Sequence, residues 1–278
     1  MATPKLYILP MGQIENDLAW NIAVPKAGSV DDPHPAAEWV RVPCFAYLIE
    51  HPQLGRILFD LGPHPEDGTR LPEYARSHFP WLGASQDTIE PKLAELGLRP
   101  KDIDQIIISH MHWDHCGGLC YFSHEPAGRN VLVGKRDLEY GLLATHQDAN
   151  QPFGGGGYFR ANFELPDIAY ETLDPELGDW TLAPDLEIIN LGGHTPQVLG
   201  IVLRLANTGT VILPSDAIYM AKNYGPPPIA PGIVHDTLGF FKSVARVKRL
   251  QAARQAAIFY PHDPEQMRQL RYAPLFYD

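Results

Sequence analysis

The 278-residue sequence lacks several features that would assign it to common classes of protein. No apolar run reaches the roughly 18 residues that a membrane helix needs. The first residues, MATPKLYILPMG, lack the charged start and the longer apolar core of a signal peptide, and they predict a first β-strand. Only three cysteines are present (Cys44, Cys116 and Cys120), without the spacing of a disulfide scaffold. We therefore expect a cytoplasmic protein with no membrane partner.

Positive charge is also sparse. The chain has 22 Lys and Arg against 33 Asp and Glu, which gives a formal net charge of −11, and its basic residues do not cluster. Proteins that bind polyanions rely on basic patches that release counterions. We therefore do not expect RNA or DNA as a partner.

Nothing in the sequence divides the chain. There is no internal repeat, charge run or shift in composition, and 45% of the residues are hydrophobic. This length and composition are ordinary for a globular protein with one large core. We expect residues 1–278 to form a single domain.

Histidine is locally abundant. The segment 109–118 reads SHMHWDHCGG. In an extended segment His110 and His112 project to the same side, because side chains alternate along the backbone. Asp114 and His115 are then expected to open a helix whose first turn directs both towards the same cavity. The two glycines that follow allow the backbone to approach where a larger residue would clash.

Potential metal ligands also follow four predicted strands. Each run is short, β-branched or aromatic, and ends near a Gly, Pro or Ser. Ligand sites in layered α/β folds gather on loops at one end of the strands. The four runs with the residues that follow them are Gln105–Ser109 with His110, Leu186–Asn190 with His194, Thr210–Leu213 with Asp216, and Ala257–Tyr260 with His262.

Further elements are expected earlier in the chain, and most other histidines are expected to have no special role. Strand-like runs occur at Leu6–Leu9, Cys44–Ile49 and Arg56–Phe59, and apolar residues recur at helical spacing over Asp87–Leu98. A lone histidine is usually a surface residue or a hydrogen-bonded core residue. We interpret seven in this way: His34, His51, His64, His78, His124, His146 and His235.

The histidines outside this group of seven, together with Asp114 and Asp216, predict a dinuclear metal centre. Two such ions would lie about 3.5–4 Å apart. Zinc is the default expectation, although nitrogen and carboxylate sites also accept iron, cobalt or manganese. Because seven His and Asp residues already fill two sites, we expect neither Cys116 nor Cys120 to bind metal. The expected first set is His110, His112 and His194, the second set is Asp114, His115 and His262, and Asp216 bridges the two.

The segment HMHWDH matches the H-x-H-x-D-H signature of the metallo-β-lactamase superfamily. Together with His194, Asp216 and His262, it resembles that superfamily's seven-ligand set in chain order. The resemblance implies an α/β fold, an αββα sandwich in which two sheets pack face to face with helices outside. The predicted strands are compatible with this fold, although periodicity alone does not select it.

Several branches of the superfamily fit poorly. Class B1 β-lactamases have a cysteine at the place of Asp216, and flavodiiron proteins carry acidic ligands within the motif. Glyoxalase II proteins add a helical domain, whereas only 16 residues follow His262 here. RNA-processing members must bind a polyanion, for which the net charge of −11 of this chain is unfavourable.

N-acyl-homoserine lactonases fit better. Tyr219 follows Asp216 by three residues, and the segment 262–266, HDPEQ, resembles the HDxEQ ending of that branch. The opening PKLYILPMG, the strand Cys44–Pro52 and the stretch Tyr224–Phe240 are also similar. The segment Gly192–Gln197 departs, since many members have a second Gly-His there, which leaves the ligand intact but alters the neighbouring pocket wall.

The resemblance implies a metal-dependent hydrolase that opens the ring of an N-acyl-homoserine lactone by attack of a metal-bridging hydroxide, as in quorum quenching. Tyr219 would stabilise the oxyanion and Asp114 would carry a proton to the leaving oxygen. The plain alternative for Tyr219 is a hydrogen-bonded core tyrosine. Related lactonases are often dimers, so a homodimer is one expected assembly.

An acyl tail also needs an apolar groove. Residues near strand ends or in loops are the candidates for this groove, although any one such residue is more often a plain core residue. The glycine run Gly154–Gly157 is either a mobile flap or a plain connector. Competing functions are hydrolysis of another lactone, an ester or a phosphoester on the same site, and a metal-binding sensor without catalysis. The candidate substrate-binding residues are Trp20, Phe45, Trp81, Phe153, Tyr219 and Ile233.

Overall fold

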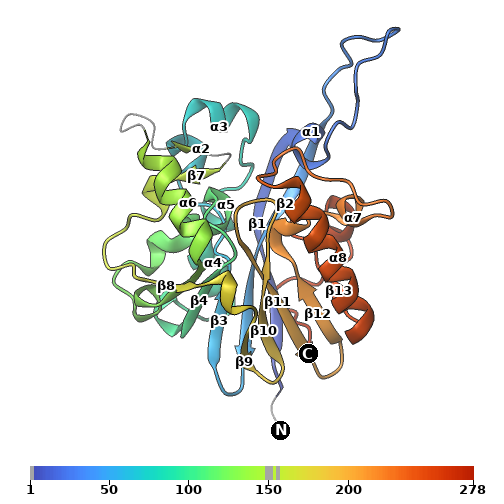
Figure 1. Ribbon diagram of the computed structural model, residues 1–278. Helices are drawn as coiled ribbons and strands as arrows, with labels where there is room; N and C mark the ends of the chain where they lie inside the picture. Colours follow the sequence, from blue (N-terminus) through green and yellow to red (C-terminus); the bar gives the residue numbers. More distant parts are fainter. Residues whose placement is uncertain (1–2, 148–152, 155–156) are drawn as a thin grey trace.

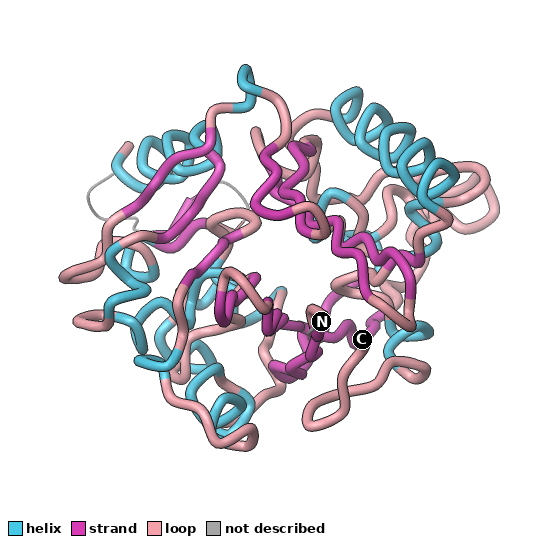
Figure 2. Tube along the Cα trace, turned by 90° about the horizontal axis from the view of Figure 1, so that it is seen from below, coloured by secondary structure: helices cyan, strands magenta, loops and turns pink. Residues whose placement is uncertain are grey.

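A computed structural model of the chain describes residues 3–147, 153–154 and 157–278. Two main β-sheets face each other, and helices cover the outer side of each sheet (Figures 1 and 2). The layers thus follow the order αββα. This confirms the expected fold class.

The first sheet has six strands in the order β1-β2-β3-β4-β5-β8. Strands β1, β2 and β3 pair antiparallel, whereas β3, β4, β5 and β8 pair parallel. The parallel strands therefore end at the same edge of the sheet. The bounds are β1 (Lys5–Asp17), β2 (Trp39–His51), β3 (Gly55–Phe59), β4 (Gln105–Ile108), β5 (Val131–Gly134) and β8 (Tyr170–Leu173).

The second sheet has five strands in the order β13-β12-β11-β10-β9. Strand β13 is parallel to β12, and the other neighbours are antiparallel. The bounds are β9 (Trp180–Ala183), β10 (Leu186–Leu191), β11 (Val198–Leu205), β12 (Gly209–Leu213) and β13 (Ala257–Ile258). A separate two-stranded sheet pairs β6 (Phe153–Gly154) with β7 (Tyr158–Phe159).

Helix α6 lies against the outer side of the first sheet and α8 against the outer side of the second, whereas α3 lies beyond the strand ends at the top of the view (Figure 1). Within the described ranges, no helix is both long and apolar enough to cross a bilayer. The helices are α1 (Leu18–Asn21), α2 (Asp67–Arg70), α3 (Glu73–His78), α4 (Ile89–Ala94), α5 (Trp113–Cys116), α6 (Lys135–His146), α7 (Ala221–Tyr224), α8 (Thr237–Arg254) and α9 (Pro264–Met267).

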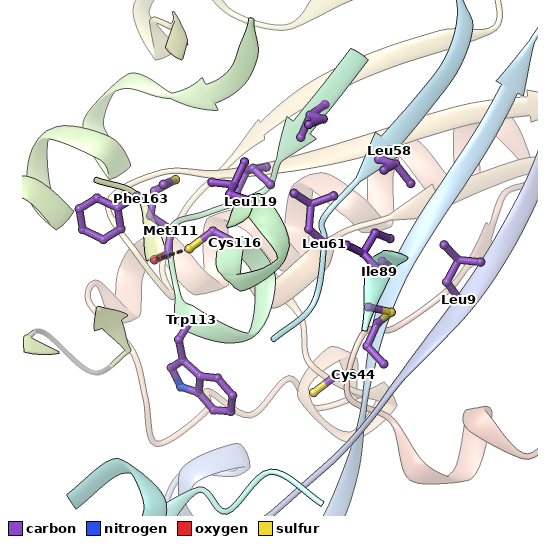
Figure 3. Close-up of a cluster of buried hydrophobic side chains, with 14 of the residues drawn as sticks. Leu9, Cys44, Leu58, Leu61, Ile89, Met111, Trp113, Cys116, Leu119 and Phe163 are labelled. Carbon is purple, nitrogen blue, oxygen red and sulfur yellow. Dashed lines mark hydrogen bonds between the residues drawn. The ribbon is translucent and has the colours of Figure 1, made fainter. Parts of the chain in front are cut away.

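Strand β2 is apolar on both faces because both faces are covered. Phe45 and Tyr47 belong to the core between the two sheets. Cys44, Ala46 and Leu48 alternate with them and pack on the helical side, in the cluster shown in part in Figure 3. Burial on both faces explains why such strands have nearly continuous apolar sequences.

Most predicted elements are confirmed, and two are shorter than expected by at least two residues. The predicted strand at 257–260 is paired only over Ala257–Ile258, because the backbone N–H of Tyr260 donates instead to Gln266 Oε1 at 2.7 Å. The predicted helix at 87–98 is helical only over α4, which follows a 3₁₀ turn at Ser85–Asp87. Gly97, with φ of 73°, lies just beyond that helix, as a terminating glycine does.

Candidate metal centre

Three imidazole rings meet beyond the ends of β4 and β10. His110 lies two residues after β4, His112 immediately precedes α5, and His194 lies in the loop after β10. His194 Nε2 is 3.1 Å from His110 Nε2 and 2.9 Å from His112 Nδ1. All three side chains are buried. We call these three residues the imidazole half of the site.

Asp114, His115 and His262 form a second group, which we call the carboxylate half. Asp114 Oδ2 is 3.6 Å from His115 Nε2 and 3.8 Å from His262 Nε2. Asp216, in a 3₁₀ turn just after β12, lies between the halves. Its Oδ1 is 3.2 Å from His115 Nε2 and 3.1 Å from His262 Nε2, while its Oδ2 is 3.4 Å from His194 Nε2.

The imidazole half is electrically neutral near neutral pH. Burial is the main cause that holds the pKa of His110 and of His112 well below the usual range, and the neighbouring histidines add to it. Burial likewise lowers the pKa of His194 to about 4. Neutral rings keep a lone pair free, which is the form of histidine that binds a metal.

The carboxylate half has the opposite balance. Burial is the largest single influence on His115 and His262 and disfavours their charge, but the neighbouring carboxylates of Asp216 and Asp114 together outweigh burial and raise the pKa of both rings. Burial also opposes charge on Asp216, yet the same two histidines hold its pKa well below the usual range. For Asp114, burial prevails and raises the pKa.

The donor set fits divalent metal ions. Among the described residues, His115 Nε2 and Asp216 Oδ1 are buried and make no hydrogen bond, which is costly without another partner. Ligand atoms of His110, His112 and His194 all lie within 4.8 Å of one another, and so do those of His110, His115 and Asp216. Nitrogen and carboxylate oxygen are donors that zinc-like ions accept.

The Nδ1 atoms of His115 and His262, which face away from the cluster, each have a polar partner. His115 Nδ1 lies 2.9 Å from Asp60 Oδ2, and Asp60 further accepts hydrogen bonds from the backbone N–H and the hydroxyl of Ser109 at 2.7 and 2.8 Å. His262 Nδ1 donates to the carbonyl of Pro43 at 2.7 Å. Such contacts fix which ring nitrogen faces the metal. Asp60 adopts the left-handed region, with φ of 59°, a strain that often marks functional sites.

The expectation for the two glycines of the motif is confirmed. A Cβ on Gly117 would lie 2.3 Å from the backbone nitrogen of His64, and one on Gly118 would lie 2.5 Å from the carbonyl oxygen of Leu61. Any larger residue would push the motif away from the loop after β3. That loop begins with Asp60, so the glycines also keep this carboxylate within reach of the centre.

Tyr219 lies beside the imidazole half. Its hydroxyl oxygen is 2.8 Å from His194 Nδ1, and that nitrogen is also 3.3 Å from the carbonyl oxygen of Ile233. Burial is the main cause that keeps the pKa of Tyr219 well above its usual range, so the phenol stays protonated.

A cavity opens onto the ligand cluster. Two of the predicted substrate-binding residues, Tyr219 and Ile233, line it. A second cavity contains Trp20 and shares His194 and Ile233 with the first. Apolar residues that the sequence analysis did not single out also line the first cavity: Ile14, Val42, Phe79 and Trp113.

Two other predicted substrate-binding residues, Phe45 and Trp81, lie away from these two cavities. Phe45 packs between the sheets against Tyr47 and Tyr272, and Trp81 is held in the core by a hydrogen bond from its Nε1 to the carbonyl of Met11. Neither lines the two cavities, because both side chains fill core space instead. The side chain of Phe153 and part of Gly154–Gly157 lie outside the described residues.

Two residues near the centre escaped the sequence analysis. Asp60 directly follows strand β3, which is the same strand-then-ligand pattern that indicated His110, so the pattern could have found it. Cys44 gave no signal, because it lies inside an apolar strand far from the motif in sequence. Its sulfur, an Asp114 oxygen and a His262 nitrogen lie within 4.8 Å of one another.

Cys116, which lies within the histidine motif, and His51, which lies outside the candidate centre, have ordinary core roles. Cys116 donates a hydrogen bond to the carbonyl of Met111 at 3.4 Å (Figure 3). His51 is buried with Nε2 2.9 Å from Asp185 Oδ1, as expected for a hydrogen-bonded core histidine.

The αββα layers and the clustered histidines are typical of one class of metal-binding hydrolases. A comparison of the sequence with known families points to the same class. The sequence profile of the metallo-beta-lactamase superfamily matches residues 39–262. The chain belongs to this superfamily.

Individual relatives show which members of the superfamily this chain is similar to. Two proteins named N-acyl homoserine lactonase AiiB, from Agrobacterium fabrum and Rhizobium rhizogenes, are each 31% identical over 278 residues, which cover 96% of this chain and 96% of each relative. A crystal structure of Bacillus thuringiensis AiiA with N-decanoyl-L-homoserine bound at its active site matches with a TM-score of 0.81. The match has 24% identity and covers 99% of this chain and 100% of that one, and it is a likeness of fold.

Proposed function

We propose that this protein is a metal-dependent hydrolase that opens the lactone ring of N-acyl homoserine lactones. The observation that carries the proposal is the buried cluster in which Asp216 faces three imidazoles on one side and the carboxylate half on the other. Relatives at 31% identity over nearly the full length are named for this activity. We further propose that residues 1–278 act as one hydrolase domain.

The imidazole half would hold one divalent ion and the carboxylate half a second, with Asp216 shared between them. When bound, two such ions supply a nucleophile from water near neutral pH and polarise an ester carbonyl. Zinc is the proposed metal, because nitrogen and carboxylate donors suit it. The three free cysteines are compatible with the proposed cytoplasmic location.

Tyr219 would stabilise the oxygen that becomes negative when the lactone carbonyl is attacked. If His194 Nε2 faces a metal, the ring proton is on Nδ1, which lies 2.8 Å from the Tyr219 oxygen. Tyr219 then accepts that hydrogen bond, and its own O–H remains free to donate into the cavity that it lines. A buried neutral phenol is a strong donor to a developing oxyanion.

Asp114 would carry a proton to the ring oxygen that leaves. It lines the same cavity, and burial raises its pKa, which favours the temporary binding of a proton. The apolar tail would lie along the wall formed by Val42, Phe79 and Ile233. This division places the polar chemistry at the ring and leaves apolar contact to the tail.

A substrate panel on purified protein of measured metal content tests the proposal. Lactones of varied acyl length, nitrophenyl esters and phosphodiesters are compared, and ring opening is followed by pH-stat titration because each opening yields an acid. We expect homoserine lactones to be the best substrates. Hydrolysis of esters or phosphodiesters without any homoserine lactone would leave only the broader hydrolase, and bound metal without any hydrolysis would indicate a sensor.

A further inference from the structure

Cys44 is a third kind of donor at the edge of the centre. It lies on β2, only 2% exposed, directly after Pro43, whose carbonyl oxygen accepts the hydrogen bond from His262. Figure 3 shows its sulfur pointing away from Leu9 and Ile89, its neighbours in the apolar cluster. The backbone that orients one metal ligand thus also presents a thiol.

The distances suit shared coordination. The Cys44 sulfur, an Asp114 oxygen and a His262 nitrogen are no more than 4.8 Å apart, so one point lies within about 2.8 Å of all three. Zinc holds sulfur at about 2.3 Å and nitrogen at about 2.0–2.1 Å. At that upper limit, shifts of about 0.5 Å for the sulfur and about 0.7–0.8 Å for the nitrogen would bring these donors to bonding distance.

A second observation marks this side of the cluster as a ligand site. Within the described residues, His115 Nε2 and Asp216 Oδ1 are buried without a hydrogen bond. The first atom lies 3.6 Å from Asp114 Oδ2 and the second lies 3.1 Å from His262 Nε2. The thiol of Cys116 offers a contrast, because it is committed to the carbonyl of Met111. Cys44 instead lies beside two side chains that already serve as donors.

We propose that Cys44 is a ligand of the metal in the carboxylate half, together with Asp114 and His262. This inference rests on the proposed metal centre and adds a sulfur donor to it. On binding, the S–H bond is replaced by a sulfur–metal bond and the proton leaves to solvent. A thiolate favours zinc or cobalt over harder ions such as manganese or magnesium, so the two metal positions differ in selectivity.

Cobalt(II) loading of the purified full-length protein tests the inference without relying on turnover. Sulfur bound to cobalt(II) gives an intense charge-transfer absorption in the near ultraviolet, which nitrogen and oxygen donors do not give. We expect this band in the unaltered protein at two cobalt ions per chain. Cys44→Val and Cys44→Ser should lose the band and release one of the two ions at least about tenfold more readily to a chelator. Cys120→Ser, which removes a thiol outside the centre, should keep both properties.

The outcomes separate the inference from the proposed function. Two bound cobalt ions without the band, or a Cys44→Val protein that retains both ions as tightly as the unaltered one, would make Cys44 a packing residue and leave the dinuclear hydrolase intact. Failure to bind cobalt or zinc at all would overturn the inference and the proposed centre together. If Cys44→Ser fails to fold, two measurements still decide whether Cys44 binds the metal. They are the spectrum of the unaltered protein and that of Cys44→Val, a variant that keeps the apolar packing.

Discussion

The buried histidines in the two halves of the centre differ in their pKa values and therefore in their charge. In the imidazole half, burial and like neighbours lower the pKa of each ring, so His110, His112 and His194 face one another as neutral groups. In the carboxylate half, His115 and His262 pair with Asp216 and gain charge. One half thus consists of neutral nitrogen donors, whereas the other carries charges that its own residues partly compensate.

Removal of the residue between the halves is expected to have the largest effect. Asp216→Ala should abolish turnover and lower the metal content, because it deletes the oxygens that face both halves and leaves buried histidines without their counter-charge. Metal analysis and lactone titration on the same sample measure this. Asp174→Ala, which removes a carboxylate paired with Lys135 on the surface, is the control. Full activity of Asp216→Ala would show that the site is misassigned.

Tyr219→Phe should keep the metals and slow the reaction. The lost hydrogen bond to the oxyanion should cost on the order of 1–3 kcal/mol, roughly tenfold to a few hundredfold in kcat. Metal content and stability serve as internal controls, since a tyrosine with only a core role would alter stability and leave the rate unchanged. An unchanged rate returns Tyr219 to that core role.

Asp60→Asn should weaken only the carboxylate half. An amide can still accept from Ser109, but it no longer offers a carboxylate to His115 Nδ1. Loss of such an outer partner typically costs about 10–100-fold in metal affinity or activity. Chelator competition should show one of two ions released early. Equal weakening of both ions would contradict the separate roles of the two halves.

Because the histidines of the two halves differ in charge, pH should change their contributions to the stability of the metal-free protein in opposite directions. Folding lowers the pKa of His110 from 6.5, so the unfolded state binds more protons and this residue costs stability as the pH falls below that value. Folding raises the pKa of His262, so its contribution is fully present below 6.5 and is lost as the pH rises through the folded value.

Urea unfolding between about pH 5.5 and 8 measures both slopes. His110→Gln should make stability fall less steeply towards low pH, and His262→Gln should make it fall more steeply, each by up to about 1 kcal/mol per pH unit. Slopes that change in the same direction would contradict the assigned charges.

Tail length should have the smallest effect. Each additional buried CH₂ is worth at most about 0.8 kcal/mol, or about fourfold in KM. Contacts that do not react stabilise ground and transition states alike, so kcat should change less than KM. Both constants for a series of acyl chains test this, and Ile233→Ala should reduce the dependence. A kcat that rises with chain length as steeply as KM falls would place the tail contacts in the transition state.

Sequence reasoning predicted the parts of this molecule that depend on short-range patterns. The strand-then-ligand pattern located His110, His194 and Asp216 at strand ends, and the glycine pair was correctly expected to permit close approach. Side-chain direction across a strand was less accessible. Phe45 and Cys44 are neighbours in one apolar run, yet one faces the other sheet and one lies beside the metal centre, a difference fixed by the register of β2 and by what covers each face.

The contact between His262 and the carbonyl of Pro43 has a consequence for biosynthesis. It joins residues 219 positions apart, so the carboxylate half cannot assemble until most of the chain has been synthesised. The His110–His115 segment is synthesised well before His194, Asp216 and His262, so at that stage it would offer a metal ion only part of the candidate ligand set. A bound ion would therefore meet the complete set of candidate ligands only in the folded protein.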